Sequence, residues 1–278
     1  MNIALLVCLG LLANVKVLAQ KKANVTGVLG AVAFNNVIFM FTTLSFVVFL
    51  GTKVSPTTLI LSILFGAATV LYQLLFILAI NKGPVSISVL IANFSVLPVS
   101  VYGLICGEAA KPARIIGLVL VLISLALNTR RENKKAGALW LLTAVGSALL
   151  SGIGMIILRI HQNTPYAAER NVFLFYGYLF ATAVSVLLAL LFKNKGSFKI
   201  NKKFITLGAV VGFVLAGYQF VLIWLSGLLD ATFMYPLISG FTLLFNFVFS
   251  PLFFKEKLTP KQITAAVLGT AAILILQF

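Results

Sequence analysis

Acidic residues are scarce in this sequence, with five Asp and Glu against 21 Lys and Arg in 278 residues. Charged residues of both signs amount to 9%, whereas a soluble globular domain carries about 25%. So few charges cannot cover the surface of a water-soluble chain of this length. The shortage of charge therefore excludes a soluble globular fold.

Histidine and cysteine are also rare, with one His and two Cys. Cys8 and Cys106 lie in apolar runs, and their spacing fits neither a zinc motif nor a disulfide framework, so we expect two buried thiols. The five acids are dispersed between the apolar runs or lie at their ends. An enzyme needs a carboxylate pair, a nucleophile with its base, or a set of metal ligands. We therefore expect neither catalysis nor a cofactor.

Long apolar runs make up most of the chain, since hydrophobic residues are 61% and the mean hydropathy is +1.13. A helix that crosses a bilayer needs about 17–25 mostly apolar residues. We therefore expect an all-α integral membrane protein with ten transmembrane helices. The runs cover 3–19, 28–50, 59–80, 84–106, 114–128, 137–158, 172–192, 204–226, 231–253 and 262–278.

Basic residues gather in alternate loops between these runs. Five of the 21, Lys53, Lys111, Arg114, Arg159 and Arg170, fall on the side that holds the N-terminus, and the other 16 fall on the opposite side. The positive-inside rule then places both termini outside the cell. We attribute the net charge of +16 to topology and to attraction by anionic lipid headgroups, and not to nucleic acid.

Two stretches recur about half a chain apart. The sequence "GAATVLYQLLFI" at 66–77 aligns with "GFVLAGYQFVLI" at 212–223, and "GEAAKPARIIGLVL" at 107–120 aligns with "KEKLTPKQITAAVL" at 255–268. Each half would hold five spans, and an odd number of spans inverts the second copy. Such inverted repeats are a known plan of secondary transporters, with the substrate near the membrane midplane.

We therefore predict two inverted five-helix repeats, at 1–130 and 136–278, joined by a loop at 128–137. The fourth-helix sequence "NKGPVSISVLIANFSVLPV", the following "GE" and the later "FFKEKLTPKQITAAVLG" resemble the drug/metabolite transporter superfamily, in its ten-helix EamA-type branch. The resemblance extends over nearly the whole chain. It implies a multi-pass transporter of the plasma membrane, with both termini inside, opposite to the charge bias. Members of that family carry amino acids, organic cations, nucleotide sugars and other metabolites, so the resemblance implies no single substrate.

Polar side chains within the apolar runs are candidates for a substrate site. Tyr72–Gln73 and Tyr218–Gln219 occupy equivalent places in the two repeats. We predict that they flank the midplane and either bind substrate or close a gate, with shared packing as the alternative. A second group lies on one helical face: Tyr235, Ser239, Thr242 and Asn246. The remaining candidates are Asn14, Asn36, Asn93 and Trp224.

Charged residues near the ends of the runs have simpler interpretations. We expect Lys16 and Arg159 to extend toward the membrane surface, with a cavity cation for a carboxylate or phosphate as the alternative for each. Glu108 and Glu256 each precede a helix that begins at a proline. A carboxylate there can accept hydrogen bonds from free backbone amides, so we interpret both as helix caps.

These patterns predict a secondary transporter that moves a small polar or amphiphilic metabolite, such as an amino acid or a related molecule, by alternating access. No acid lies within a span, which argues against a proton-coupled cation exporter. The 12% aromatic residues leave an exporter of organic cations, recognised by cation–π contacts, as the alternative. An accessory membrane subunit without transport of its own is the third hypothesis. The sequence favours neither a monomer nor a homodimer.

Overall fold

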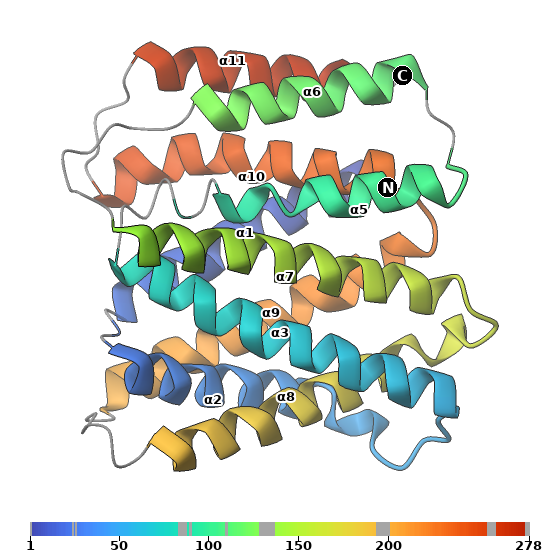
Figure 1. The fold of residues 1–278 in the computed structure, drawn as a ribbon, viewed down its shortest axis with the longest axis vertical. Helices are drawn as coiled ribbons and strands as arrows, with labels where there is room; N and C mark the ends of the chain where they lie inside the picture. The colour runs from blue at the N-terminus through green and yellow to red at the C-terminus, as the bar shows by residue number, and fades with distance from the viewer. Residues whose placement is uncertain are drawn as a thin grey trace.

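The computed structural model describes residues 2–23, 25, 27–82, 88, 91–108, 111–127, 137–192, 201–254 and 260–275. Within these residues the protein is helical and contains no strand, as expected (Figure 1). The α-helices are α1 (Asn2–Ala23), α2 (Gly27–Ser45), α3 (Pro56–Lys82), α5 (Val96–Ile105), α6 (Pro112–Leu127), α7 (Ala138–Gln162), α8 (Arg170–Phe192), α9 (Lys202–Ser226), α10 (Ala231–Phe254) and α11 (Pro260–Ile275). Two short 3₁₀ helices are η1 (Val47–Phe49) and η2 (Ala167–Glu169).

Several of these helices are long and apolar enough to cross a membrane. Among the described residues there are six: Ile3–Ala23, Gly27–Ser45, Pro56–Lys82, Ala138–Gln162, Ala167–Phe192 and Lys202–Ser226. Shorter apolar helices cover Ile91–Ile105, Pro112–Ser124 and Ala231–Phe245. The chain therefore has the helical make-up of a multi-pass membrane protein.

Local sequence explains where several helices begin. Pro56, Pro112 and Pro260 are the first residues of α3, α6 and α11, a position where the missing N–H of proline costs no hydrogen bond. Asn201 caps α9, because its side chain accepts a 2.8 Å hydrogen bond from the backbone N–H of Phe204.

Helices that are distant in sequence form most of the packing. The helix α3 packs against α7 and α8, whereas α9 packs against α1 and α2. Likewise α1 lies against α10, α7 lies against α5, and α6 pairs with α11 along one edge of the bundle (Figure 1). The large contacts thus join helices before the 128–137 segment to helices after it.

Two glycines bring helix backbones unusually close. A Cβ on Gly66 of α3 would lie 2.5 Å from the carbonyl oxygen of Gly177 in α8. A Cβ on Gly212 of α9 would lie 2.6 Å from the carbonyl oxygen of Ile38 in α2. Both distances are too short for any side chain, and small residues of this kind let membrane helices approach closely.

A buried ion pair closes one end of the bundle. Glu108 accepts 2.9 Å hydrogen bonds from the backbone N–H groups of Ala231 and Thr232, the first residues of α10, and from Arg159 Nη2. The side chains of Arg159 and Glu108 are only 11% and 8% exposed. The capping role of Glu108 is confirmed, but the helix that it caps comes from the other half of the chain and is not the one that follows it.

The same ion pair corrects one expectation, and the thiols correct another. Arg159 does not extend toward the membrane surface, since it also donates hydrogen bonds to the backbone carbonyls of Ser226 and Leu229. The expectation of two buried thiols is wrong as well, because Cys106 is exposed where α5 ends and Cys8 is only partly buried. Glu256 lies outside the described residues.

Candidate functional site

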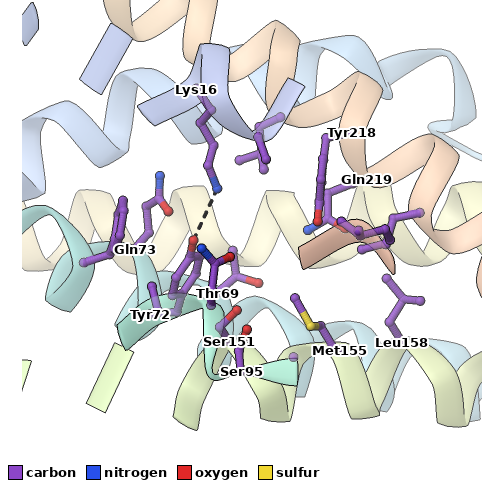
Figure 2. A pocket seen from close by; sticks show the side chains of 18 of the residues that line it. Lys16, Thr69, Tyr72, Gln73, Ser95, Ser151, Met155, Leu158, Tyr218 and Gln219 are labelled. Atoms are coloured by element: carbon purple, nitrogen blue, oxygen red, sulfur yellow. Dashed lines mark hydrogen bonds between the residues drawn. The ribbon is translucent and has the colours of Figure 1, made fainter. Parts of the chain in front are cut away.

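A pocket lies inside the bundle, between side chains of α1, α3, α5, α7, α8, α9 and α10 (Figure 2). The centre of a water-sized molecule can occupy a volume of about 120 Å³ inside it. One water needs about 10–15 Å³ on this measure, so the pocket has room for several waters or for one small metabolite.

The pocket brings together most of the residues that the sequence singled out. Eight of the twelve line it: Tyr72, Gln73, Asn93, Tyr218, Gln219, Tyr235, Ser239 and Thr242. Three of them come from α3 and the helical turn before α5, and the other five come from α9 and α10, more than a hundred residues later in the sequence. These polar groups face one another across the interior, and not toward lipid, where unsatisfied polar groups are costly.

Asn14 has a different role from the one predicted. Its Nδ2 donates two 2.9 Å hydrogen bonds, to the backbone carbonyls of Gly10 and Thr242. The side chain is 5% exposed and does not line the pocket. Asn14 therefore joins α1 to α10 and has no free donor of its own to offer a ligand.

Asn36 and Trp224 do not line the pocket. Asn36 is on α2, and its Oδ1 is buried without a hydrogen-bond partner in the protein. Trp224, on α9, is partly buried and packs against the apolar core. The side chain of Asn246 lies outside the described residues.

The two Tyr–Gln pairs lie on opposite sides of the pocket (Figure 2). Tyr72 and Gln73 come from α3, and Tyr218 and Gln219 come from α9. Gln73 is 1% exposed, and its Nε2 has no hydrogen-bond partner in the protein. A buried donor without an acceptor costs about 1–3 kcal/mol, so this amide is suited to water or a ligand in the pocket.

Lys16 has the position of the alternative interpretation, a cation in the cavity. It points from α1 into the pocket, where its Nζ donates a 3.2 Å hydrogen bond to Tyr72 Oη (Figure 2). The expectation of a side chain that extends to the membrane surface is wrong because α1 continues to Ala23, past the end of the apolar run. Lys16 therefore lies seven residues before the helix end, or about 10 Å at 1.5 Å per residue.

Lys16 is the one charged side chain among the described residues that line the pocket. The three acids that the structure describes are each bonded elsewhere. Glu108 binds Arg159, Glu169 accepts hydrogen bonds from Ser55, and Asp230 lies 2.5 Å from Arg114. The ammonium of Lys16 thus faces the pocket without a carboxylate from these residues.

Four further polar residues line the pocket and were missed from the sequence: Thr69, Ser95, Ser151 and Tyr178. Thr69 precedes Gln73 by four residues and therefore shares its face of α3. This spacing could have been recognised. Tyr178 is 0% exposed, and no pattern in the apolar sequence of α8 separates it from the neighbouring aromatic residues.

The chain thus has the helical make-up of a multi-pass membrane protein, with an internal pocket lined by polar and apolar side chains. No family model matches the sequence, and no curated protein is similar to it. A solved structure described as "Crystal structure of protein" has a TM-score of 0.74 with this chain, over 99% of this chain and 98% of the other, at 14% identity. At that identity the likeness concerns the fold alone.

Proposed function

We propose that the protein is a secondary transporter of the drug/metabolite type in the plasma membrane, which moves a small polar or amphiphilic metabolite by alternating access. The observation that carries this proposal is the internal pocket flanked by Tyr72–Gln73 and Tyr218–Gln219. A site between two halves can open to one side of the membrane at a time when the halves tilt against each other.

The packing pattern supports an inverted repeat. If α1, α2, α3, α5 and α6 correspond to α7, α8, α9, α10 and α11, most of the major contacts have a counterpart, although the contact of α10 with α11 has none of similar size between α5 and α6 in the described residues. The contacts of α3 with α7 and α8 correspond to those of α9 with α1 and α2, and the contact of α1 with α10 corresponds to that of α7 with α5. The pairs α2–α8 and α6–α11 map onto themselves, as elements on a twofold axis do.

The helix crossings at Gly66 and Gly212, called the glycine crossings, support the repeat in atomic detail. Gly66 and Gly212 are 146 residues apart, the same offset as the two Tyr–Gln pairs. A Cβ on Gly66 would meet Gly177 O, the Phe180 side chain and Ala181 N, and a Cβ on Gly212 would meet Ile38 O, the Phe41 side chain and Thr42 N. Each neighbour in the first set is 139 residues beyond its counterpart in the second. Two copies of one packing unit account for this agreement.

Transport by purified protein in liposomes tests the proposal. Liposomes preloaded with amino acids, organic acids, nucleosides or quaternary amines should exchange at least one class faster than protein-free liposomes, and uptake should saturate. The absence of flux for every class, under solute, proton and sodium gradients, would refute the proposal.

Two substitutions test the site itself. Tyr72→Phe and Tyr218→Phe should each change the apparent substrate affinity or the rate of exchange. Tyr166→Phe is the matched control, because Tyr166 is 40% exposed and lies outside the pocket. If both pocket variants transport like the control, the Tyr–Gln pairs serve packing.

A further inference from the structure

Lys16 gives the pocket a positive end, and this end bears on the chemistry of the substrate. We propose that the pocket binds a small organic monoanion, with its carboxylate on Lys16 and Tyr72 and its apolar or aromatic body toward Met155 and Leu158. The inference rests on the proposed function only in taking this pocket as the transport site.

The wall of the pocket near Lys16 carries several hydrogen-bond donors. The ammonium of Lys16 has three N–H groups, and one of them donates to Tyr72 Oη. Since the Tyr72 oxygen accepts that bond, its own O–H group stays free to donate. Gln73 Nε2, which is buried and has no partner, adds a further donor at the wall of the pocket. Such an array of donors suits a ligand that only accepts, as a carboxylate does.

The positive charge of Lys16 has no opposite charge among the described residues that line the pocket. Lys16 is half-buried, and a cation that is partly removed from water without a counter-charge loses solvation. The described acids are bonded elsewhere, as Glu108 is to Arg159. A bound anion supplies the missing charge to Lys16 and forms a charge-assisted hydrogen bond, which is stronger than a neutral one. The same ammonium repels an organic cation that enters the pocket. This disfavours the alternative of a cation exporter, in spite of the tyrosines.

The lining of the pocket also favours a ligand of a particular charge and shape. One ammonium neutralises a monoanion, whereas a phosphate dianion would keep a second charge without a partner among the described lining residues. Away from Lys16 the pocket is bounded by Met155, Leu158 and Tyr218 (Figure 2). These side chains suit an apolar or aromatic body, so a carboxylate at one end of such a body matches both ends of the pocket.

Equilibrium binding to the purified full-length protein tests the proposal. The probes are benzoate, benzamide, benzamidinium and phenylphosphonate, which share one ring and differ in headgroup charge. The protein is held in phosphatidylcholine nanodiscs, and binding is measured by isothermal titration. Benzoate should bind at least about tenfold more tightly than each of the other probes, as expected for a charge-assisted bond.

Variants assign the headgroup to Lys16. Lys16→Met should weaken benzoate binding by about 10- to 100-fold, and Lys16→Arg should restore most of it. Tyr72→Phe should weaken it by a smaller factor, since one hydrogen bond is lost. Lys82→Met is the matched control, because Lys82 is an exposed lysine at the end of α3 and does not line the pocket. This control should bind like the unchanged protein.

Several outcomes overturn the proposal. One is the absence of benzoate binding at millimolar concentration. Another is binding of benzamide, benzamidinium or phenylphosphonate that is as tight as that of benzoate or tighter. A third is a benzoate affinity of Lys16→Met equal to that of the unchanged protein. A separate arm adds phosphatidylglycerol to the nanodiscs. If the lipid headgroup abolishes benzoate binding, the natural anion at Lys16 is a lipid and the inference of a soluble metabolite is wrong. These results are distinguishable from a failure of the proposed function. Benzoate binding without flux in liposomes refutes the proposal of a transporter. Flux that Lys16→Met leaves unchanged refutes the proposal of an anion site at Lys16.

Discussion

Replacing Gly212 with alanine should force α9 away from α2. The added Cβ would lie 2.6 Å from the carbonyl oxygen of Ile38, whereas a close C···O contact is about 3.3 Å. The backbones must therefore separate by about 0.7 Å at this point. A gap of this size forfeits roughly a quarter to a half of the dispersion attraction between the facing atoms, and overpacking of this kind costs about 1–3 kcal/mol.

Helix propensity acts in the opposite direction. Alanine is about 1 kcal/mol better than glycine inside a helix, so the net loss for Gly212→Ala should be about 0–2 kcal/mol. Gly66→Ala, whose Cβ would lie 2.5 Å from Gly177 O, should lose a similar amount. Gly217→Ala is the matched control in the same helix as Gly212. A Cβ there has no neighbour within 4 Å, so this variant should gain stability or stay unchanged.

The assay is reversible unfolding of the purified protein in mixed detergent micelles, followed by the fluorescence of Trp140 and Trp224. It yields the free energy of unfolding for each variant. The reasoning is refuted if Gly212→Ala is as stable as Gly217→Ala. A difference above about 1 kcal/mol between Gly66→Ala and Gly212→Ala would count against the equivalence of the two crossings.

Three further substitutions test contacts of different burial by the same unfolding assay. Glu108→Gln should lower the free energy of unfolding by about 3–5 kcal/mol, because it leaves the buried Arg159 without a counter-charge. Adding Arg159→Met to this variant should recover part of that loss. If the losses of the two single variants simply add, the pairing of Glu108 with Arg159 is contradicted. Asp230→Asn should change stability by less than about 1 kcal/mol, since the Asp230 side chain is 42% exposed; a loss as large as that of Glu108→Gln would contradict this. Asn14→Ala should cost about 0.6–1.7 kcal/mol for its bonds to two carbonyls, and an unchanged unfolding energy would show that those bonds contribute nothing.

Sequence reasoning succeeded where chemistry repeats at a fixed spacing. Tyr72–Gln73 and Tyr218–Gln219 were recognised because both pairs interrupt apolar runs at matching places, and the structure brings both pairs to one pocket. The helical character also followed directly from run length and composition, although the described residues include six helices that qualify as spans where ten were expected. The number of spans and the inverted repeat therefore stay predictions.

Sequence reasoning failed where the outcome depends on how helices are rotated or how far they extend. Lys16 was misjudged because the end of an apolar run is not the end of its helix. Asn36 and Trp224 were placed in the site by residue type, but the face that each presents depends on neighbours that no local pattern specifies. The partner of Glu108 is the start of α10, more than 120 residues away in sequence, and a local capping rule cannot find it.

The contacts between distant helices have a consequence for the assembly of the protein as it is synthesised. The helix α3 packs mainly against α7 and α8, and α1 and α2 pack against α9. The helices α1, α2 and α3 are synthesised first, so they lack these packing partners until α7, α8 and α9 have been inserted into the membrane. During that interval the polar wall formed by Lys16, Tyr72 and Gln73 has no opposite wall, and it faces lipid or the insertion machinery. Insertion factors that shelter polar helices should matter most in this interval, between the synthesis of α3 and that of α9.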